Sequence, residues 1–292
     1  MKVRIGIGPG ASDAGELSAL AVLLEERRID SLWSSEVVSG PQVEPFTGMA
    51  WVAARTEHLK VGTGVSVLPG RHPVLVAKQL ASLAALAPRR VLPVFGLQPA
   101  RFAERAFFPV PGPRGEVLDE ALALVRRLLT EPAVTFSGRF FTVEEAGVGP
   151  LPAKPLDLWL GGSAPAGLRR AGRLADGWLG SFLSPAQAAD AVVAIRQAAD
   201  EAGRAVDDDH YGMSLPVADG AADEATLRAL RARNPEVDVR DVVASGWEHA
   251  RELLGRYAEA GVSKFVVRPA GPPRSWARFI DEFAAELLPL QT

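Results

Sequence analysis

The sequence contains no cysteine, only four histidines and no long uninterrupted hydrophobic run. The lack of cysteine excludes disulfides, thiolate catalysis and zinc–thiolate sites, and it favours a cytoplasmic protein. Because no window holds about 18 consecutive apolar residues, we expect no membrane-spanning helix. The first apolar run is short and broken by glycine and proline, so it predicts a strand and no signal peptide. A net charge of −3 gives no basic field that would attract nucleic acid or anionic lipid.

The composition is that of a globular protein with a large core, since 48% of the 292 residues are hydrophobic and 23% are charged. This length suits one α/β barrel, which needs about 250 residues. We therefore expect residues 1–292 to form a single domain. Arginine outnumbers lysine by 27 to 5, which indicates a GC-rich coding sequence.

Short β-branched runs alternate with apolar helix patterns along the chain. The expected strands comprise residues 3–7, 31–34, 60–65, 90–95, 157–160, 177–181, 210–215 and 264–268. The expected helices comprise residues 14–28, 45–56, 72–86, 114–129, 165–174, 185–202, 247–260 and 273–287. Eight alternations predict parallel pairing and a (β/α)8 TIM barrel. An open dinucleotide-binding sheet fits less well, because Pro9 removes an amide that its phosphate-binding turn would need.

Three stretches fall outside this repeat. Residues 97–113 form a loop after the fourth strand, and residues 218–245 form a charged insertion after the seventh, with a short helix expected at 223–233. Loops that follow barrel strands face the active site, so both are candidate lids, although a solvated helix explains the second equally well. Residues 134–142 are typical of a small β-hairpin that turns at Ser137-Gly138.

A barrel enzyme works at the carboxyl ends of its strands. Here those ends are rich in glycine and poor in titratable groups: Gly8-Pro9, Ser34-Ser35-Glu36, Gly64-Val65-Ser66, Gly96-Leu97-Gln98, Gly161-Gly162-Ser163, Gly180-Ser181-Phe182, Pro216 and Arg268-Pro269. Neither a Ser–His–Asp set nor a metal-binding cluster is visible. His58, His210 and His249 are expected to be structural or surface residues, and His72 either belongs to the site or caps a helix. Such strand ends favour a large planar cofactor that brings its own reactivity.

Two glycine-containing segments are the strongest candidates for cofactor contacts. Gly161-Gly162-Ser163 ends a buried strand and is followed at once by a helix. The glycines would let backbone amides approach a ligand closely, and Ser163 could cap the helix. Because a helix N-terminus favours an anion, the segment predicts a phosphate site, the alternative being an ordinary strand-to-helix turn. Gly62 and Gly64, inside a strand pattern, predict a β-bulge that projects into the barrel mouth.

Taken together, these motifs resemble the luciferase-like monooxygenase family. Residues 55–65, which lead to Arg71-His72-Pro73, and residues 77–83 are similar to one family signature. Residues 161–171, followed by Ala175-Asp176-Gly177-Trp178, are similar to a second, and Gly138-Arg139-Phe140-Phe141 resembles the family's hairpin. The size and the lack of large insertions look most like the branch that uses the deazaflavin coenzyme F420, which is common in actinobacteria.

The resemblance implies a TIM barrel, often a homodimer, that holds F420 at the barrel mouth and acts on a small organic substrate. It implies a non-proline cis peptide at Gly64–Val65, next to Ser66, that supports the cofactor ring. Glu36 takes the place of an acidic residue that contacts the ring. The remaining cofactor contacts that it suggests are Gly96, Gly161, Gly162, Ser163, Ala164 and Ser181.

The chain departs from the related sugar-phosphate dehydrogenases at two positions. The histidine and glutamate that serve as acid–base groups there are replaced by Val37 and Pro99. We therefore do not expect oxidation of glucose 6-phosphate. The resemblance instead predicts hydride transfer with a less polar substrate, and the candidate catalytic residues are Ser35, Glu36 and Gln98, with Ser181 or solvent as further proton carriers.

Two other functions remain open at this stage. One is an FMN-dependent monooxygenase on the same barrel, and the other is a flavin- or deazaflavin-binding barrel without catalysis. The tail of F420 is longer and more anionic than that of FMN. Basic groups near the mouth therefore favour F420, and the candidates are Arg71, Arg169, Arg170 and Arg173.

Overall fold

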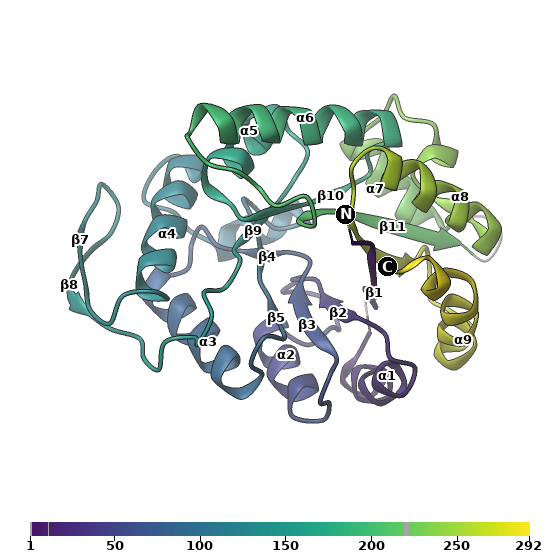
Figure 1. Cartoon of the computed structure of the whole chain (residues 1–292), viewed down its shortest axis with the longest axis horizontal. Helices are drawn as coiled ribbons and strands as arrows, with labels where there is room; N and C mark the ends of the chain where they lie inside the picture. Colours follow the sequence, from purple (N-terminus) through teal and green to yellow (C-terminus); the bar gives the residue numbers. More distant parts are fainter. Residues whose placement is uncertain (1, 11, 219–221) are drawn as a thin grey trace.

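The main sheet of the protein is parallel and surrounded by helices (Figure 1). The computed structural model describes residues 2–10, 12–218 and 222–292. The strands of this sheet that form the barrel are β1 (Arg4–Ile7), β2 (Ser31–Ser34), β3 (Lys60–Thr63), β4 (Ser66–Val67), β5 (Val91–Leu92), β6 (Val94–Gly96), β9 (Trp159–Gly161), β10 (Gly177–Ser181), β11 (Tyr211–Ala218) and β13 (Lys264–Pro269).

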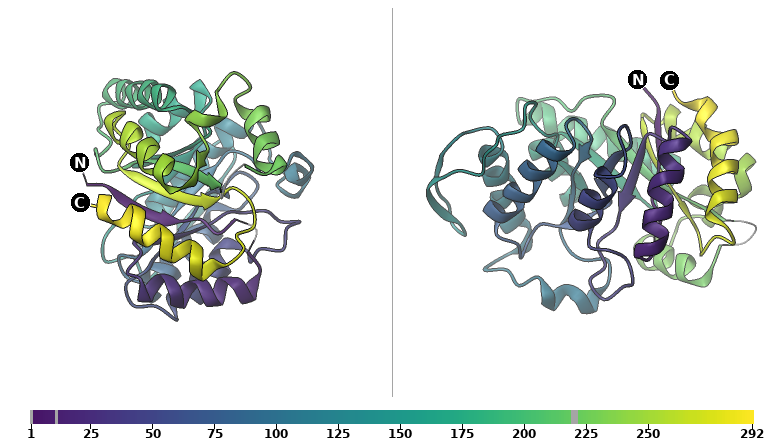
Figure 2. Two further views of the ribbon diagram at one scale, coloured as in Figure 1. Left: turned by 90° about the vertical axis from the view of Figure 1, so that its right-hand side faces the viewer. Right: turned by 90° about the horizontal axis from the view of Figure 1, so that it is seen from below.

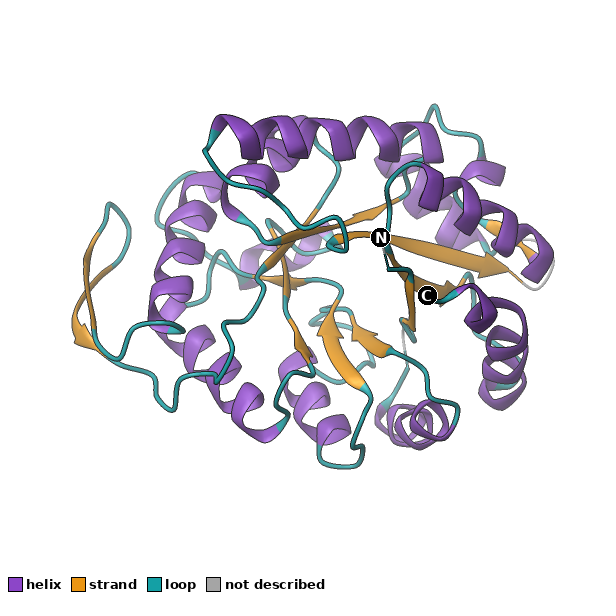
Figure 3. Cartoon of the chain, in the orientation of Figure 1, coloured by secondary structure: helices purple, strands orange, loops and turns teal. Residues whose placement is uncertain are grey.

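The sheet closes on itself into a barrel (Figure 3). Strands β3 and β4 are two parts of one barrel strand, and β5 and β6 are two parts of the next. Because β3 pairs with β5, β4 with β6 and β13 with β1, the circuit of parallel pairs is complete. The predicted eight-stranded TIM barrel is therefore confirmed, with the correction that the predicted strands 60–65 and 90–95 are each divided.

The predicted helices form the outer layer of the barrel. They are α1 (Ala14–Glu26), α2 (Pro45–Ala53), α3 (Pro73–Leu86), α4 (Arg114–Leu128), α5 (Pro165–Leu174), α6 (Pro185–Glu201), α8 (Gly246–Glu259) and α9 (Trp276–Leu287). Helices α1 and α6 begin with capping boxes, in which Asp13 pairs with Glu16 and Ser184 with Gln187. The prediction for the last helix starts three residues early, because Ser275 is the residue that caps it.

Two tryptophans fill the inside of the barrel. Trp33 and Trp159 are buried and form an interior cluster with residues of β6, β10 and β13. A Cβ placed on Gly62 would lie 2.8 Å from the Trp33 ring, and one on Gly177 would lie 2.3 Å from the Trp159 ring. Gly62 therefore makes room for a large interior side chain, which is a different role from the bulge that its position predicts.

The divided strands are joined by the side chain of Thr63. Its hydroxyl donates to the carbonyl of Val94 and accepts the amide of Val94, both at 2.7 Å. Pro93, between β5 and β6, has no amide to donate to the ladder. Directly after Thr63, the last residue of β3, the peptide bond between Gly64 and Val65 is cis, as the resemblance implies.

Three segments leave the barrel, as the sequence indicates. The hairpin of β7 (Val134–Ser137) and β8 (Thr142–Ala146) projects at the left of Figure 1. Its turn spans residues 138–141, where the amide of Gly138 donates to the carbonyl of Phe141, so the turn predicted at Ser137-Gly138 lies two residues later, at Arg139-Phe140. The loop after β6 contains the short 3-10 helix η1 (Phe102–Phe107).

The insertion after β11 packs against the body of the protein. It contains α7 (Glu224–Arg233), η2 (Val239–Asp241) and β12 (Ala244–Ser245), which pairs with β11. Leu230 is buried, and the Asn234 amide donates to the carbonyl of Phe182 beyond β10. The insertion is thus anchored, unlike a freely solvated helix. Residues 219–221 of the predicted insertion, and Ala11 of the first turn, lie outside the described residues.

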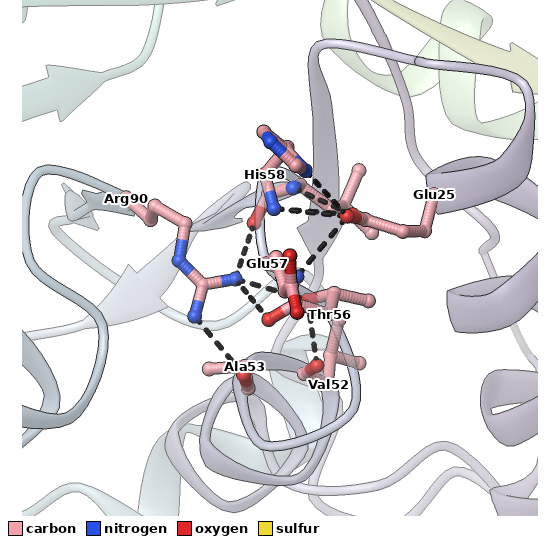
Figure 4. A network of polar contacts seen from close by, with 8 residues as sticks. Glu25, Val52, Ala53, Thr56, Glu57, His58 and Arg90 are labelled. Carbon is pink, nitrogen blue, oxygen red and sulfur yellow. Dashed lines mark hydrogen bonds and ion pairs between the residues drawn. The ribbon is translucent and has the colours of Figure 1, made fainter.

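Glu25 organises the end of the barrel opposite the mouth (Figure 4). Its carboxylate accepts the backbone amides of Glu57, His58 and Leu59, just before β3 begins. It also lies 2.9 Å from Nδ1 of His58, so the prediction that His58 is structural is confirmed. Beside this cluster, the Arg90 guanidinium donates to three carbonyls at and beyond the end of α2, which stabilises the C-terminus of that helix.

The Glu25 cluster predicts a loss of stability in acid. Burial alone would raise the pKa of Glu25, but the hydrogen bonds from His58 and three amides outweigh it and lower the pKa from 4.5 to about 2. Glu25 therefore stabilises the fold above pH 4.5, by at most about 3 kcal/mol, and this contribution disappears as the pH falls towards 2. Urea unfolding should show Glu25→Gln less stable than the wild type at pH 7, with the difference shrinking below pH 4.5 and the two proteins converging only as the pH approaches 2. A pH-independent difference would contradict the assignment.

The two termini lie side by side (Figure 2). The amide of Val3 donates to Oγ1 of Thr292, and the amide of Ile5 donates to Oε1 of Gln291. Among the described residues, no helix is both long and apolar enough to cross a bilayer.

Candidate active site at the barrel mouth

The side chain of Val65 forms a platform at the barrel mouth, the end at which the strands finish at their carboxyl termini. Val65 follows the cis peptide bond and is half-buried. A Cβ on Gly96 would lie 2.7 Å from one methyl of Val65, and a Cβ on Gly161 would lie 2.7 Å from the other. The structure thus brings together the predicted residues Gly64, Val65, Gly96 and Gly161. The two glycines of β6 and β9 make room for the platform.

Glu36 holds the platform from the side of β2. Its backbone amide donates to the carbonyl of Val65 at 3.2 Å, and its carboxylate accepts the amide of Val67 at 2.6 Å and a short bond from Arg71. The side chain is 3% exposed. Burial raises the pKa of Glu36, although the bonds from Val67 and Arg71 oppose that rise. Both carboxylate oxygens are thus engaged by Val67 and Arg71, so Glu36 positions the cis segment.

Arg268 is the site residue that the sequence prediction missed. Its guanidinium donates to Oγ of Ser214 at 2.7 Å, to Oγ of Ser35 at 2.8 Å and to the carbonyl of Gly64 at 2.9 Å. A Cβ on Gly8 would lie 2.9 Å from its Cζ, so a glycine is needed where the side chain passes β1. Burial lowers the pKa of Arg268 to about 10, and the group stays charged at neutral pH.

The arginine has no carboxylate partner among the residues that the structure describes. Its three acceptors are neutral, and Arg268 is half-buried. Ser35 donates its own hydroxyl proton to the Gly64 carbonyl at 3.0 Å. The predicted proton carrier is therefore occupied in holding the cis peptide and the guanidinium.

The turn after β9 is fixed by Trp178. Gly162 has φ of +117°, a conformation that favours glycine, and a Cβ there would meet nothing within 4 Å. The indole N–H of Trp178 donates to the carbonyl of Gly162 at 2.7 Å. Helix α5 starts at Pro165, and its N-cap is Ala164, so the prediction that Ser163 caps the helix is wrong. The Ser163 hydroxyl makes no hydrogen bond within the described part of the chain.

Three other predicted residues stand at strand ends without polar side-chain contacts among the described residues. Gln98 is exposed beyond β6, and Ser181 is half-buried at the end of β10. Oγ of Ser66 is fully buried and has no hydrogen-bond partner there.

Two of the four candidate basic groups are already engaged. Arg71 is bound to Glu36 and lies between the rings of Phe46 and Phe108, 5.8 Å from each centroid. Arg170 forms a short ion pair with Asp119. Only Arg169 and Arg173, both on α5, remain exposed.

The other three histidines make local contacts. His72 occupies the N-cap position of α3 without a capping side-chain bond, and its ring packs against Phe141 of the hairpin. Nδ1 of His210 lies 2.7 Å from the carbonyl of Asp176, and Nδ1 of His249 accepts the amide of Ser245. Across residues 2–10, 12–218 and 222–292 there is no group of three or more potential metal ligands.

Glu104 joins the loops that follow β2 and β6. It is 1% exposed, and its carboxylate accepts the amides of Val38 and Ser39 and the Ser39 hydroxyl. Burial would raise the pKa of Glu104, but the bonds from Ser39 and Val38 outweigh it and lower the pKa. Beside these loops lies a cavity of about 430 Å³, whose wall includes Glu36, Val37 and Arg71. Val37 thus gives this cavity an apolar wall.

The relatives and solved structures that this chain resembles include proteins named for F420 or solved with FMN. The chain is 27% identical to an F420-dependent glucose-6-phosphate dehydrogenase of Kineococcus radiotolerans, over 94% of this chain and 93% of the relative. Its fold matches an F420-dependent secondary alcohol dehydrogenase solved with an F420–acetone adduct, with a TM-score of 0.84 and 20% identity over all of both chains. It also matches the FMN-bound oxygenating constituent of 3,6-diketocamphane monooxygenase from Pseudomonas putida, with a TM-score of 0.77 and 16% identity over 100% of this chain and 99% of that one.

The model of one family, described as luciferase-like monooxygenase, matches residues 1–285. That match covers every barrel strand, the cis peptide of the third strand and the Gly-Gly turn after β9. The chain therefore belongs to the luciferase-like monooxygenase family.

Proposed function

We propose that this protein is an F420-dependent oxidoreductase that transfers a hydride between the deazaflavin and a small organic substrate. The observation that carries the proposal is the pairing of the Val65 platform with the open turn at Gly162. Gly161 underlies the platform, and the next residue faces open space before a helix N-terminus. A flat ring and an anionic tail need such neighbouring surfaces.

The residues present fit a bound deazaflavin. The half-buried isopropyl group of Val65 offers an apolar contact for one ring face, and Glu36 fixes the backbone from the Val65 carbonyl to the Val67 amide. Gly162, Ser163 and Ala164 would hold the phosphate with their backbone amides and the Ser163 hydroxyl. When bound, the deazaflavin supplies a carbon centre that accepts or releases a hydride.

The chain itself contributes position and charge. Glu36, Ser35 and Arg268 hold the Val65 platform and the Gly64 carbonyl. Val65 would offer an apolar contact to a bound ring, and Val37 lines the cavity beside Glu36. Since Val37 and Pro99 replace the acid–base pair of the sugar-phosphate dehydrogenases, we propose a substrate other than glucose 6-phosphate. Where the hydride transfer is accompanied by a proton transfer, solvent, Gln98 or Ser181 would supply or accept that proton.

Tryptophan fluorescence measures whether the protein binds F420 or FMN. The Cβ of Trp33 lies 3.7 Å from a Cβ placed on Gly64, directly beneath the platform, so ring binding should quench its emission. We expect F420 to bind at least about ten-fold more tightly than FMN. Tighter binding of FMN would favour the monooxygenase, and binding of neither would refute the proposal. Binding of F420 without turnover of any reductant or oxidant would favour the non-catalytic barrel.

Trp178→Phe should weaken F420 binding by about five- to ten-fold. The substitution removes the hydrogen bond to the Gly162 carbonyl but keeps an aromatic ring, and such a bond contributes about 1–1.5 kcal/mol. The same fluorescence titration measures the change. Trp247→Phe is the matched control, because it removes the same kind of indole hydrogen bond from a residue of α8, where the partner is Glu282 of α9. Equal affinities of the wild type and Trp178→Phe would show that the turn does not depend on this bond.

We also propose that the protein forms a homodimer through α2 and α3. Leu75 and Leu86 are 65% and 71% exposed and are eleven residues apart, which places them on one face of α3. Trp51 is exposed on the neighbouring helix α2. Light scattering after gel filtration should give twice the chain mass for the wild type and the single chain mass for Leu75→Arg/Leu86→Arg. A monomeric wild type would refute the proposal.

A further inference from the structure

Arg268 crosses the barrel mouth. Its side chain starts on β13 and reaches the Gly64 carbonyl after β3, and β1 and β2 lie between those strands in the sheet. Gly8 and Gly64 leave the space that this path needs. The guanidinium therefore lies across the floor of the mouth.

Arg268 starts from the strand that lies opposite the Val65 platform, and its guanidinium reaches back to the Gly64 carbonyl beside that platform. The platform is carried by β4, β6 and β9, and β6 is its middle strand. In the closed order of barrel strands, β13 is as far from β6 as the ring allows, with β9, β10 and β11 between them on one side. A flat ring with one face on Val65 would turn its other face toward β13. A substrate placed for hydride transfer must occupy that intervening space.

The Arg268 guanidinium has N–H groups that its contacts do not use. Three of its five N–H groups donate to Ser214, Ser35 and Gly64, and the other two make no hydrogen bond within the described residues. Its acceptors are neutral, whereas the Arg71 charge is compensated by Glu36. A half-buried cation with neutral partners is most stable when an anion joins it.

From these contacts we infer that Arg268 recognises the substrate and that the substrate carries a carboxylate. Two free N–H groups match the two oxygens of a carboxylate. A phosphate dianion would need a second cation, and none of the other strand ends in the described ranges offers an unpaired one. The inference rests on the proposed function only in placing the cofactor ring on Val65.

Calorimetric titration with benzoate and its neutral analogue benzamide tests the inference, with and without bound F420. The wild type should bind benzoate at least about ten-fold more tightly than benzamide. Arg268→Gln and Arg268→Met should abolish that preference, the second variant filling the same space without a polar group. Arg268→Lys should keep part of it. Arg251→Gln is the control, because Arg251 lies 48% exposed on α8 in an ion pair with Glu286.

Equal binding of benzoate and benzamide by the wild type would overturn the inference, and so would a preference that survives in either charge-removing variant. Circular dichroism establishes that each variant is folded, and the wild-type comparison alone remains decisive if neither folds. The F420 titration distinguishes failure of the proposed cofactor from failure of the inferred substrate carboxylate. An Arg268-dependent preference without F420 binding refutes only the proposed cofactor, whereas F420 binding without the preference refutes only the carboxylate.

Discussion

Gly162→Asp should lower the affinity for F420 by at least about 100-fold, which corresponds to about 2.7 kcal/mol. A Cβ at this position meets nothing within 4 Å, so the new side chain extends into the space where we propose the phosphate binds. Its negative charge would repel that phosphate next to the N-terminus of α5. Fluorescence titration with F420 measures the loss.

Two variants separate charge from backbone strain. Gly162→Ala imposes the same strain at φ of +117° but adds no charge, so it should weaken binding much less than Gly162→Asp. Gly255→Asp adds the same carboxylate at an exposed glycine of α8 that also has open surroundings. It should bind F420 as the wild type does. If Gly162→Asp retained wild-type affinity, the phosphate would have to bind elsewhere.

The barrel itself could be predicted because its signals are local. The alternation of apolar strands and amphipathic helices recurs within short windows, and each helix brings its own caps, such as Asp13 and Ser184. The residues at which helices begin and end could be predicted less well, because a single capping residue decides each boundary. Ala164 stands at the N-cap of α5, where Ser163 has the more favourable side chain, since Pro165 occupies the first helical position.

The reasons for the glycines could not be predicted, because they depend on side chains distant in sequence. Gly62 and Gly177 are small because Trp33 and Trp159 fill the barrel interior. Gly96 and Gly161 are small because Val65 lies against both. A glycine in a strand pattern indicates a close approach, but the sequence does not say whether a ligand or another side chain approaches.

Arg268 was missed for a related reason. Its partners Ser35, Gly64 and Ser214 come from three other strands, between 54 and 233 residues away along the chain. An arginine at a strand end is usually a solvated surface residue. One signal was available: apart from Glu36, it is the only charged residue among the predicted strand ends, and no acidic residue is near it in sequence.

Asp30→Asn should destabilise the protein by about 3–5 kcal/mol. The carboxylate is 8% exposed and lies 2.6 Å from Nζ of Lys264 and 2.7 Å from Nζ of Lys60. Burial alone would raise the pKa of Asp30, but the two lysines outweigh it and lower the pKa to about 2. Lys264 is itself buried, so removal of the carboxylate leaves a cation that burial disfavours and that has lost its charged partner. Urea unfolding at pH 7 measures the change.

The double variant Asp30→Asn/Lys264→Met decides whether the unpaired cation causes that loss. Since it removes the buried charge together with its partner, it should be more stable than Asp30→Asn alone. Asp281→Asn is the surface control, because its pair with Arg27 is largely exposed and should contribute less than about 1 kcal/mol.

The carboxylate of Asp30 also accepts the Ser31 hydroxyl, which in turn accepts the indole N–H of Trp33 beneath the platform. Loss of Asp30 should therefore change Trp33 emission in the folded state as well as the stability. If Asp30→Asn destabilised the protein no more than Asp281→Asn does, the buried lysine would have to find another partner or lose its proton.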